Sequence, residues 1–225
     1  MPSSFGSRTG RSAPRPGEGI AGMTPPGTFE RVYAAIRQRL GEGLYRPGAR
    51  LEPALLSDEL NASVTPVRDA LHRLTGERLV EAPRHEGFRV PMMTERLLRY
   101  LYGWHLDLLL LAVVKHRTTS LAEAIVEPDG PSEIPTHERQ NALFLALART
   151  AGNPEHAAAL EALSHRLEPA QRLERYFLDE TEAETNEIVR ALQANDRKSL
   201  RRSLVRYHRR RLRIIPELLA RMLQS

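Results

Sequence analysis

A short stretch of the chain, residues 62–74, combines hydroxyl groups, basic groups and regularly spaced apolar side chains. The apolar ones fall at helical spacing on one face: Val67, Ala70, Leu71 and Leu74. The polar ones are left to point outward: Ser63, Thr65, Arg68, His72 and Arg73. Hydroxyl and guanidinium groups donate hydrogen bonds to base edges and phosphates, which is what a helix in a major groove requires. The alternative is the solvated face of an ordinary amphipathic helix.

The segments around this stretch decide between the two interpretations. Residues 28–40 predict a helix with an apolar stripe: Phe29, Val32, Tyr33, Ile36 and Leu40. Residues 53–60 predict a second helix with Leu55, Leu56 and Leu60 turned inward, and Asn61 ends it. For the third helix, Thr65 suits the capping position and Pro66 the first helical position. Two short helices joined by a tight turn predict a helix-turn-helix.

A wing is predicted directly after the third helix. Residues 79–82 and 87–90 have the pattern of two short strands, and residues 83–87 turn between them. The turn contains Arg84 and His85, so this tip is basic. Such a tip suits contact with phosphates or a minor groove.

The order of these residues resembles the GntR family of bacterial winged-helix transcription regulators. The resemblance covers about residues 28–90 and is most specific over Ser63-x-Thr65-Pro66-Val67-Arg68-Asp69-Ala70-Leu71-x-Arg73-Leu74. Pro47-Gly48 before this run and Gly87-x-x-Val90 after it also fit. The resemblance implies that double-stranded DNA is contacted by nine residues: Arg50, Ser63, Val64, Thr65, Arg68, Arg73, Arg84, His85 and Gly87.

Two positions depart from the family pattern. Val64 stands where many members have arginine, and Ala54 stands where many have arginine near the start of the second helix. Valine can contact a thymine methyl group but cannot form a bidentate hydrogen bond with guanine. The lost bond corresponds to about 1–3 kcal/mol of base discrimination, so the operator is expected to differ from that of arginine-bearing members.

The second half of the chain predicts only helices. The expected helices span residues 94–116, 136–150, 154–166 with an extension past Pro169 toward Phe177, 180–193, and 197–222 with a kink at Pro216. Residues 118–136 are rich in loop signals, with one weak helix near 121–126. The predicted fold class is therefore mainly α, a winged helix-turn-helix of three helices and a two-stranded wing followed by an all-helical bundle. The expected domains are a disordered tail over 1–22, a DNA-binding domain over 23–93 and an effector and dimerisation domain over 94–225.

This half resembles the helical effector domain of the fatty-acid-regulator (FadR) subfamily of GntR proteins. Ala146-Leu147-Ala148-x-x-Ala151-Gly152-Asn153-Pro154 matches one of its helix-end motifs. Many such domains hold a divalent metal through one aspartate and three histidines. Aligned on that motif and on Ile188 and Asp196, the ligand positions fall on Gln140, Phe144, Thr185 and Tyr207, with His208 one residue away. Phenylalanine cannot ligate and amide or hydroxyl oxygens replace imidazole poorly, so neither a metal nor another cofactor is expected.

Two interpretations of this helical core stay open. In the first, an apolar pocket with a few polar groups takes a small carboxylate or acyl effector, as ligand pockets often do. Its expected lining is Trp104, His105, Gln140, Phe144, Thr185, Tyr207 and His208. In the second, these side chains fill the core and no effector binds.

The last predicted helix is strongly basic. Nine of its residues from 197 to 213 are arginine or lysine, including Arg209, Arg210 and Arg211. Its inward stripe is expected to be Leu200, Leu204, Tyr207, Leu212 and Ile215. A solvated cationic face is the ordinary explanation, while contact with DNA, an acidic ligand or a second subunit is the alternative.

Composition limits the remaining function classes. The 225 residues include 33 basic and 28 acidic side chains, which permits a nucleic-acid partner. There is no cysteine, the apolar run 106–114 is interrupted by Asp107, and residues 1–22 lack the apolar block of a signal peptide, so a cytoplasmic protein outside the membrane is expected. No catalytic motif is found, and a non-enzyme is expected. The sequence thus predicts a homodimeric regulator that reads a palindromic operator, with or without a small-molecule effector.

Overall fold

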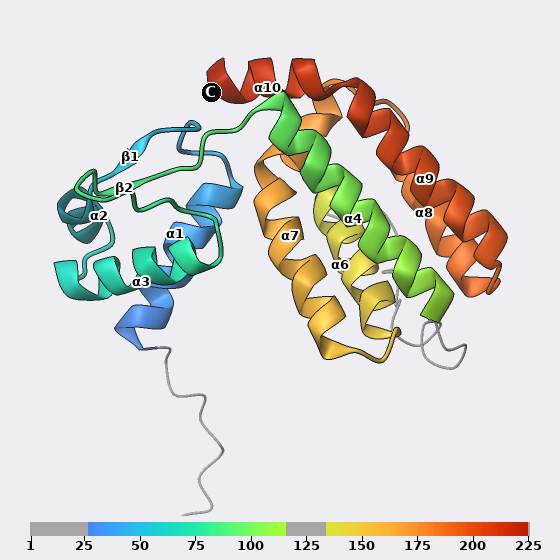
Figure 1. Cartoon of the computed structure of the whole chain (residues 1–225), viewed down its shortest axis with the longest axis horizontal. Coiled ribbons are helices and arrows are strands. Elements are labelled where there is room, and N and C mark those ends of the chain that lie inside the picture. The colour runs from blue at the N-terminus through green and yellow to red at the C-terminus, as the bar shows by residue number, and fades with distance from the viewer. Residues whose placement is uncertain (1–26, 116–133, 225) are drawn as a thin grey trace, which may run out of the picture.

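The computed structural model describes residues 27–115 and 134–224, and helices account for most of them (Figure 1). The N-terminal part holds α1 (Thr28–Gly41), β1 (Arg50–Leu51), α2 (Pro53–Glu59), α3 (Val64–Gly76) and β2 (Phe88–Arg89). The C-terminal part holds α4 (Glu95–Lys115), α6 (Thr136–Arg149), α7 (Pro154–Leu173), the short 3₁₀ helix η1 (Glu174–Tyr176), α8 (Thr181–Gln193), α9 (Arg197–Arg213) and α10 (Ile215–Gln224). The fold class is mainly α, as predicted: a winged helix-turn-helix followed by a helical bundle.

The N-terminal core forms where α1 crosses α3. Val32, Ile36 and Leu40 recur every four residues, so they share one face of α1, and all three are buried. The predicted apolar face of α3 is also buried: Val67, Ala70, Leu71 and Leu74. This packing leaves the opposite face of α3 in solvent. The domain limits proposed from the sequence stay a prediction.

Two details of the helix-turn-helix differ from expectation. The third helix begins at Val64, and Ser63 occupies the N-cap position with extended backbone angles, so Thr65 is not the capping residue and Pro66 lies within the first turn. In α2, Leu56 is buried but Leu55 is 61% exposed. Neighbouring residues on a helix do not share a face, and only one of these two leucines can point inward.

The wing pairs differently from the prediction. β2 pairs antiparallel with β1, with Arg50 opposite Arg89 and Leu51 opposite Phe88. Residues 79–82 do not form a strand and contribute one isolated bridge, Glu81 to Arg89. The reason is local, because the backbone N–H groups of residues 79 and 80 donate to the Leu74 carbonyl at the end of α3. A bonded N–H is not free to extend a ladder.

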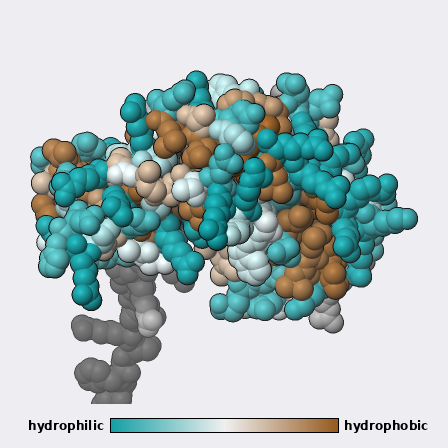
Figure 2. All heavy atoms as spheres, turned by 45° about the horizontal axis from the view of Figure 1, so that its top comes forward, coloured by the Kyte–Doolittle hydropathy of each residue, from teal (hydrophilic) through white to brown (hydrophobic). Residues whose placement is uncertain are grey.

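The C-terminal bundle is built around α4, which packs against α6, α7 and α9 (Figure 1). Its inward face includes Leu98, Leu101, Leu108 and Leu109. α4 is long enough and apolar enough to cross a membrane, which the interrupted apolar run did not lead us to expect. Core helices of soluble proteins meet the same two criteria. The packing of α4 inside the bundle accounts for the apolar residues of its inward face. Figure 2 shows that hydrophobic side chains also reach the surface between hydrophilic ones.

The predicted last helix is divided into two. α9 ends at Arg213 and α10 begins at Ile215, directly before Pro216. Proline has no backbone N–H and its ring clashes with the carbonyl four residues earlier, here that of Leu212. Arg99 Nη1 on α4 donates to this Leu212 carbonyl at 3.2 Å. The expected helix at 154–166 continues to Leu173, with Pro169 inside it. The helix expected at 121–126 lies outside the described residues.

Candidate nucleic-acid interface

The start of α3 presents an exposed polar surface. Ser63, Thr65 and Arg68 are exposed, and Val64 beside them is 38% exposed. In the described part of the chain the Arg68 side chain forms no ion pair or hydrogen bond, so its guanidinium is available to a partner. The first backbone N–H groups of a helix and the positive end of its dipole also favour a phosphate here.

Arg73, near the other end of α3, is already engaged. Its guanidinium lies 4.1 Å from the Tyr33 ring centre and pairs with Glu77 at 3.2 Å. The Tyr33 hydroxyl donates to the same carboxylate at 2.8 Å. Burial and the Glu77 carboxylate raise the pKa of Tyr33, which keeps this donor protonated. These contacts hold α3 against α1, a role that the sequence alone did not show.

The wing tip is bonded to both strands, since Arg50 of β1 and Arg89 of β2 each donate to Glu86. Arg50 Nη2 donates to the Glu86 carbonyl at 3.2 Å. His85 and Gly87 adopt positive φ angles of 63° and 76°, which make the tight turn, and Arg84 and His85 are exposed. Glycine adopts such angles without strain. The turn thus lies at the predicted residues 83–87, although the strand that pairs with β2 is β1 and not residues 79–82.

Two contacts that position α3 were not predicted. The His72 ring packs edge-on against Phe88 of β2 with centroids 4.9 Å apart, which joins α3 to the wing. On the other side, Arg31 Nη1 of α1 donates to the Leu60 carbonyl at 2.8 Å in the turn between α2 and α3. Both join residues that are far apart in the chain, and no local pattern marks them.

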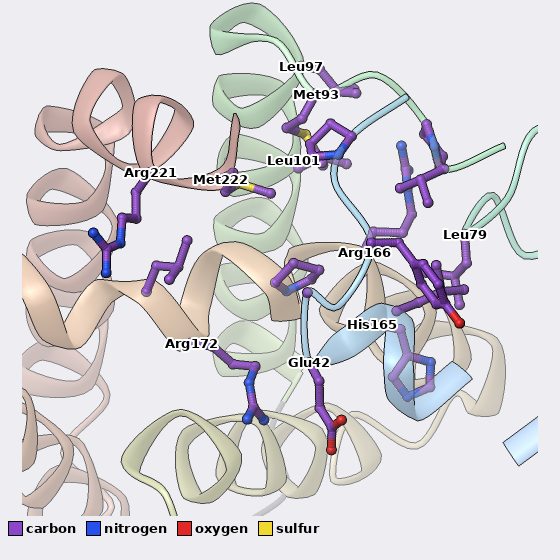
Figure 3. Close-up of a pocket in the computed structure, with 18 of the residues that line it drawn as sticks. Glu42, Leu79, Met93, Leu97, Leu101, His165, Arg166, Arg172, Arg221 and Met222 are labelled. Carbon is purple, nitrogen blue, oxygen red and sulfur yellow. The ribbon is translucent and has the colours of Figure 1, made fainter. Parts of the chain in front are cut away.

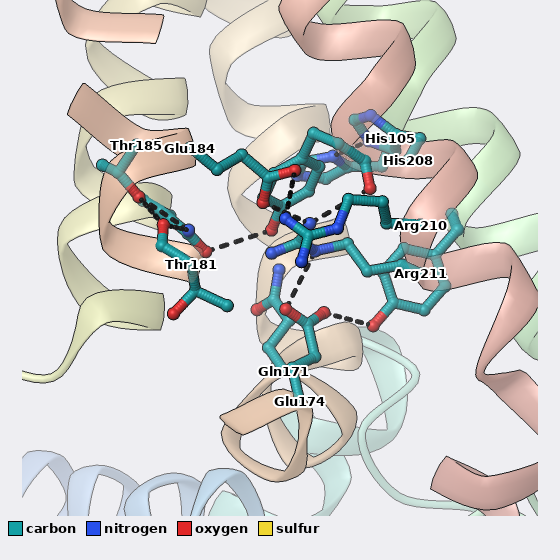
Figure 4. A network of polar contacts seen from close by, with 12 residues as sticks. His105, Gln171, Glu174, Thr181, Glu184, Thr185, His208, Arg210 and Arg211 are labelled. Atoms are coloured by element: carbon teal, nitrogen blue, oxygen red, sulfur yellow. Dashed lines mark hydrogen bonds and ion pairs between the residues drawn. The ribbon is translucent and has the colours of Figure 1, made fainter. Parts of the chain in front are cut away.

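In the helical bundle, six of the seven expected pocket residues come together. Gln140 Nε2 donates to Thr185 Oγ1 at 2.8 Å and Gln140 Oε1 accepts from the Tyr207 hydroxyl at 3.3 Å (Figure 4). The Phe144 ring packs edge-on against Tyr207 with centroids 5.1 Å apart. All of these side chains are buried and contact one another. Trp104 does not join them, because it lies on the outer face of α4 and is 53% exposed.

The two histidines of this cluster form a directed hydrogen-bond chain. Burial lowers the pKa of both, that of His208 to about 3, so both rings are neutral. His208 Nδ1 lies 2.7 Å from the Leu204 carbonyl and must donate to it. His208 Nε2 then accepts from His105 Nδ1 at 2.9 Å. The remaining ring nitrogen, Nε2 of His105, is buried with no partner in the described structure.

A buried arginine completes the core. The expectation that Arg211 belongs to the solvated cationic face of α9 is wrong, because its side chain is fully buried. It pairs with Glu174 at 2.9 Å and with Glu184 at 2.6 Å, and it lies 3.2 Å from the Tyr207 ring centre (Figure 4). Burial acts to lower the pKa of Arg211, but the two carboxylates outweigh it and the pKa is raised. Helical spacing indicates that residue 211 points inward, since it continues the stripe of Leu200, Leu204 and Tyr207.

The fold and the exposed start of α3 define a winged helix-turn-helix protein with a helical C-terminal domain. Residues 28–90 match the family described as bacterial regulatory proteins, gntR family. The N-terminal domain is therefore a GntR-family helix-turn-helix domain.

Two regulators of Escherichia coli (strain K12) are similar in sequence over this region. The HTH-type transcriptional regulator McbR is 34% identical over 83 residues, which are 37% of this chain and 38% of McbR. The HTH-type transcriptional repressor GlaR is 33% identical over 64 residues, which are 28% of this chain and 29% of GlaR. The aligned segments thus span 38% of the length of McbR and 29% of the length of GlaR.

Solved structures are similar over most of the chain. E. coli McbR/YncC superposes with a TM-score of 0.61 at 23% identity, covering 85% of this chain and 98% of that one. A putative transcriptional regulator GntR from Rhodococcus sp. RHA1 has a TM-score of 0.65 at 20% identity, covering 89% and 99%. These likenesses show that the helical C-terminal domain has the fold found in such regulators.

Proposed function

We propose that this protein is a cytoplasmic transcriptional regulator that binds a palindromic DNA operator as a homodimer. The observation that carries the proposal is Arg68, which is exposed on α3 beside Ser63 and Thr65 and has no side-chain partner among the residues that the structure describes. In winged helix-turn-helix proteins the recognition helix enters the major groove. Direct contacts are assigned to this end of α3 and to Arg84 and His85 of the wing. Arg73 acts mainly by holding α3 against α1.

Exposed apolar residues on α4 support dimerisation. They follow one face of the helix: Tyr100, Trp104, Leu111 and Val114. A row of large apolar side chains on one helix face is typical of an association surface. Two copies joined through α4 would present two recognition helices, as the half-sites of a palindromic operator require.

The contacts in the bundle core favour the second interpretation offered by the sequence, a filled core. Tyr207 forms a hydrogen bond with Gln140 and an edge-on aromatic contact with Phe144. Arg211 adds a buried ion pair between them and η1. An effector at that place would have to displace these contacts, and buried polar groups are costly to leave unpaired.

The experiment that tests this function is the Arg68→Ala variant. An operator is first selected from a random DNA pool with the wild-type protein. The variant should bind this operator at least about 10-fold more weakly, which corresponds to about 1.4 kcal/mol, because a cation on the base-reading helix is lost. Its binding to random DNA should change less.

The matched control is Arg209→Ala, which removes an exposed arginine from α9. It should leave operator affinity near the wild-type value. Circular dichroism of both variants checks that they fold. Wild-type operator affinity in a folded Arg68→Ala protein would overturn the proposal.

A further inference from the structure

A cavity of about 300 Å³ lies between the two domains. The end of α1, the segment after α3 and the start of α4 meet α7 and α10 around it (Figure 3). Its apolar wall includes Leu79, Met93, Leu97, Leu101 and Met222. A volume of this size is at the lower end of the range for small-molecule sites.

The cavity is strongly cationic. Five arginines line it: Arg78, Arg166, Arg172, Arg175 and Arg221. The one acidic residue in its lining is Glu42, whose carboxylate accepts a hydrogen bond from Gln38 at 2.8 Å. Arg172 lies 3.9 Å from the Glu138 carboxylate, and Arg175 donates to the Tyr176 hydroxyl at 2.9 Å. Positive charge therefore exceeds negative charge in a partly enclosed space.

Two of these arginines have no counter-charge. Over the described ranges, the side chains of Arg78 and Arg166 form no hydrogen bond and no ion pair. Arg166 is half-buried, and burial together with the nearby Arg78 lowers its pKa. Two guanidinium groups that repel each other beside an apolar wall are expected to attract an anion, which they bind through paired N–H groups.

We infer that this cavity binds a small amphipathic anion, a carboxylate or phosphate ester with an apolar body. The head group lies between Arg78 and Arg166, and the body lies against Leu97, Leu101 and Met222. Arg78 belongs to the N-terminal domain and Arg166 to α7 of the bundle. One bound molecule therefore contacts both domains.

The site differs from the effector pocket expected in the bundle core. Its lining contains none of Gln140, Phe144, Thr185 and Tyr207. Because it touches both domains, a ligand here can change how they are held relative to each other. The binding itself does not depend on the proposed DNA-binding function, whereas an effect on operator affinity does.

The test is calorimetric titration of the full chain with three probes of equal chain length: octanoate, octyl phosphate and octan-1-ol. At least one anion should bind, and the neutral alcohol should bind at least about 10-fold more weakly. Arg166→Gln and Arg78→Gln should each weaken anion binding by about 10-fold or more. Arg209→Gln, the charge-matched control on α9, should bind as the wild type does.

Two results would overturn the inference. The first is that neither anion binds the wild-type protein at millimolar concentration. The second is that an anion binds the wild type and the folded Arg78→Gln, Arg166→Gln double variant equally. Because neither Arg78 nor Arg166 has a side-chain partner to lose within the described structure, the double variant should unfold at the wild-type temperature or above, which thermal unfolding checks. Arg68→Ala should keep anion binding while losing the operator, so the two proposals can fail separately.

Discussion

At the scale of single residues, three arginines show how environment decides the role of one residue type. Arg211 is fully buried between two carboxylates. Among residues 27–115 and 134–224, the exposed Arg68 has no ion-pair partner, and the half-buried Arg166 has none either. Arginine is rarely buried, so composition favours the surface for each of them. Helical spacing could place Arg211 inside, and the expected extension toward Phe177 includes its partner Glu174, but no local pattern showed that these two side chains meet. The exposed hydroxyls of α3, in contrast, follow directly from the apolar stripe on its other face.

The buried histidine pair makes stability depend on pH. The pKa of His208 is about 6.5 in an unfolded chain and is lowered to about 3 in the folded one. Burial is the main cause, and the positive charge of Arg211 adds to it. As pH falls below about 6.5 the unfolded chain takes up this proton first, so the folded state loses stability until about pH 3. At pH 5 this histidine alone lowers the free energy of unfolding by about 2 kcal/mol.

Urea unfolding at pH 7 and pH 5 measures this loss. His208→Gln should lose less stability between the two pH values, because its amide does not titrate. His85→Gln, which changes an exposed histidine of the wing, should behave as the wild type. An identical loss in wild type and His208→Gln would show that this histidine is not responsible.

At the scale of secondary-structure elements, helices were predictable and strand pairing was not. The stripe of Val32, Ile36 and Leu40 locates α1 because helical contacts are local. The strand pairing of the wing depends on whether the N–H groups of residues 79 and 80 are free. Both of them donate to the Leu74 carbonyl at the end of α3. The Pro216 signal indicated a kink where the chain in fact begins a new helix.

The outer face of α4 leads to a prediction about assembly. Trp104→Glu combined with Val114→Glu should dissociate the proposed dimer, because two charges replace exposed apolar groups of this face. Operator affinity should then fall by about 10-fold or more, since one half-site is lost. Sedimentation velocity measures the first effect and operator titration the second.

The control for this pair is Leu44→Glu, which changes a residue of the N-terminal domain that is 64% exposed. It should leave the oligomeric state unchanged. A wild-type protein that is monomeric at the concentrations where it binds operator would contradict the dimer, as would a charged double variant that stays dimeric.

At the scale of the whole molecule, the cavity between the domains depends on contacts that no local pattern contains. Its lining comes from α1, the segment after α3, α4, α7 and α10. Arg37 of α1 and His165 of α7 approach to 3.1 Å at the same interface, across 128 residues of chain. The sequence indicated which residues each helix buries, but not which exposed faces meet.

The two proposed sites should be coupled if a bound anion changes how the domains are held. Saturating octanoate, or octyl phosphate if that is the anion that binds, should then change operator affinity by a measurable factor. Thermodynamic linkage requires that saturating operator changes anion affinity by the same factor. Titrating each ligand in the presence and absence of the other measures both. Unequal factors would exclude a single linked equilibrium, and two factors of one would leave two independent sites.

The buried ion pairs of the bundle make its core independent of any bound cation. The positive charge that balances Glu174 and Glu184 is covalently part of the chain, since Arg211 pairs with both carboxylates and Arg210 pairs with Glu184. A guanidinium stays protonated at any physiological pH and cannot dissociate from the protein. These two carboxylates therefore have their counter-ion from the moment the chain folds, and neither a chelator nor a change in ion supply can remove it.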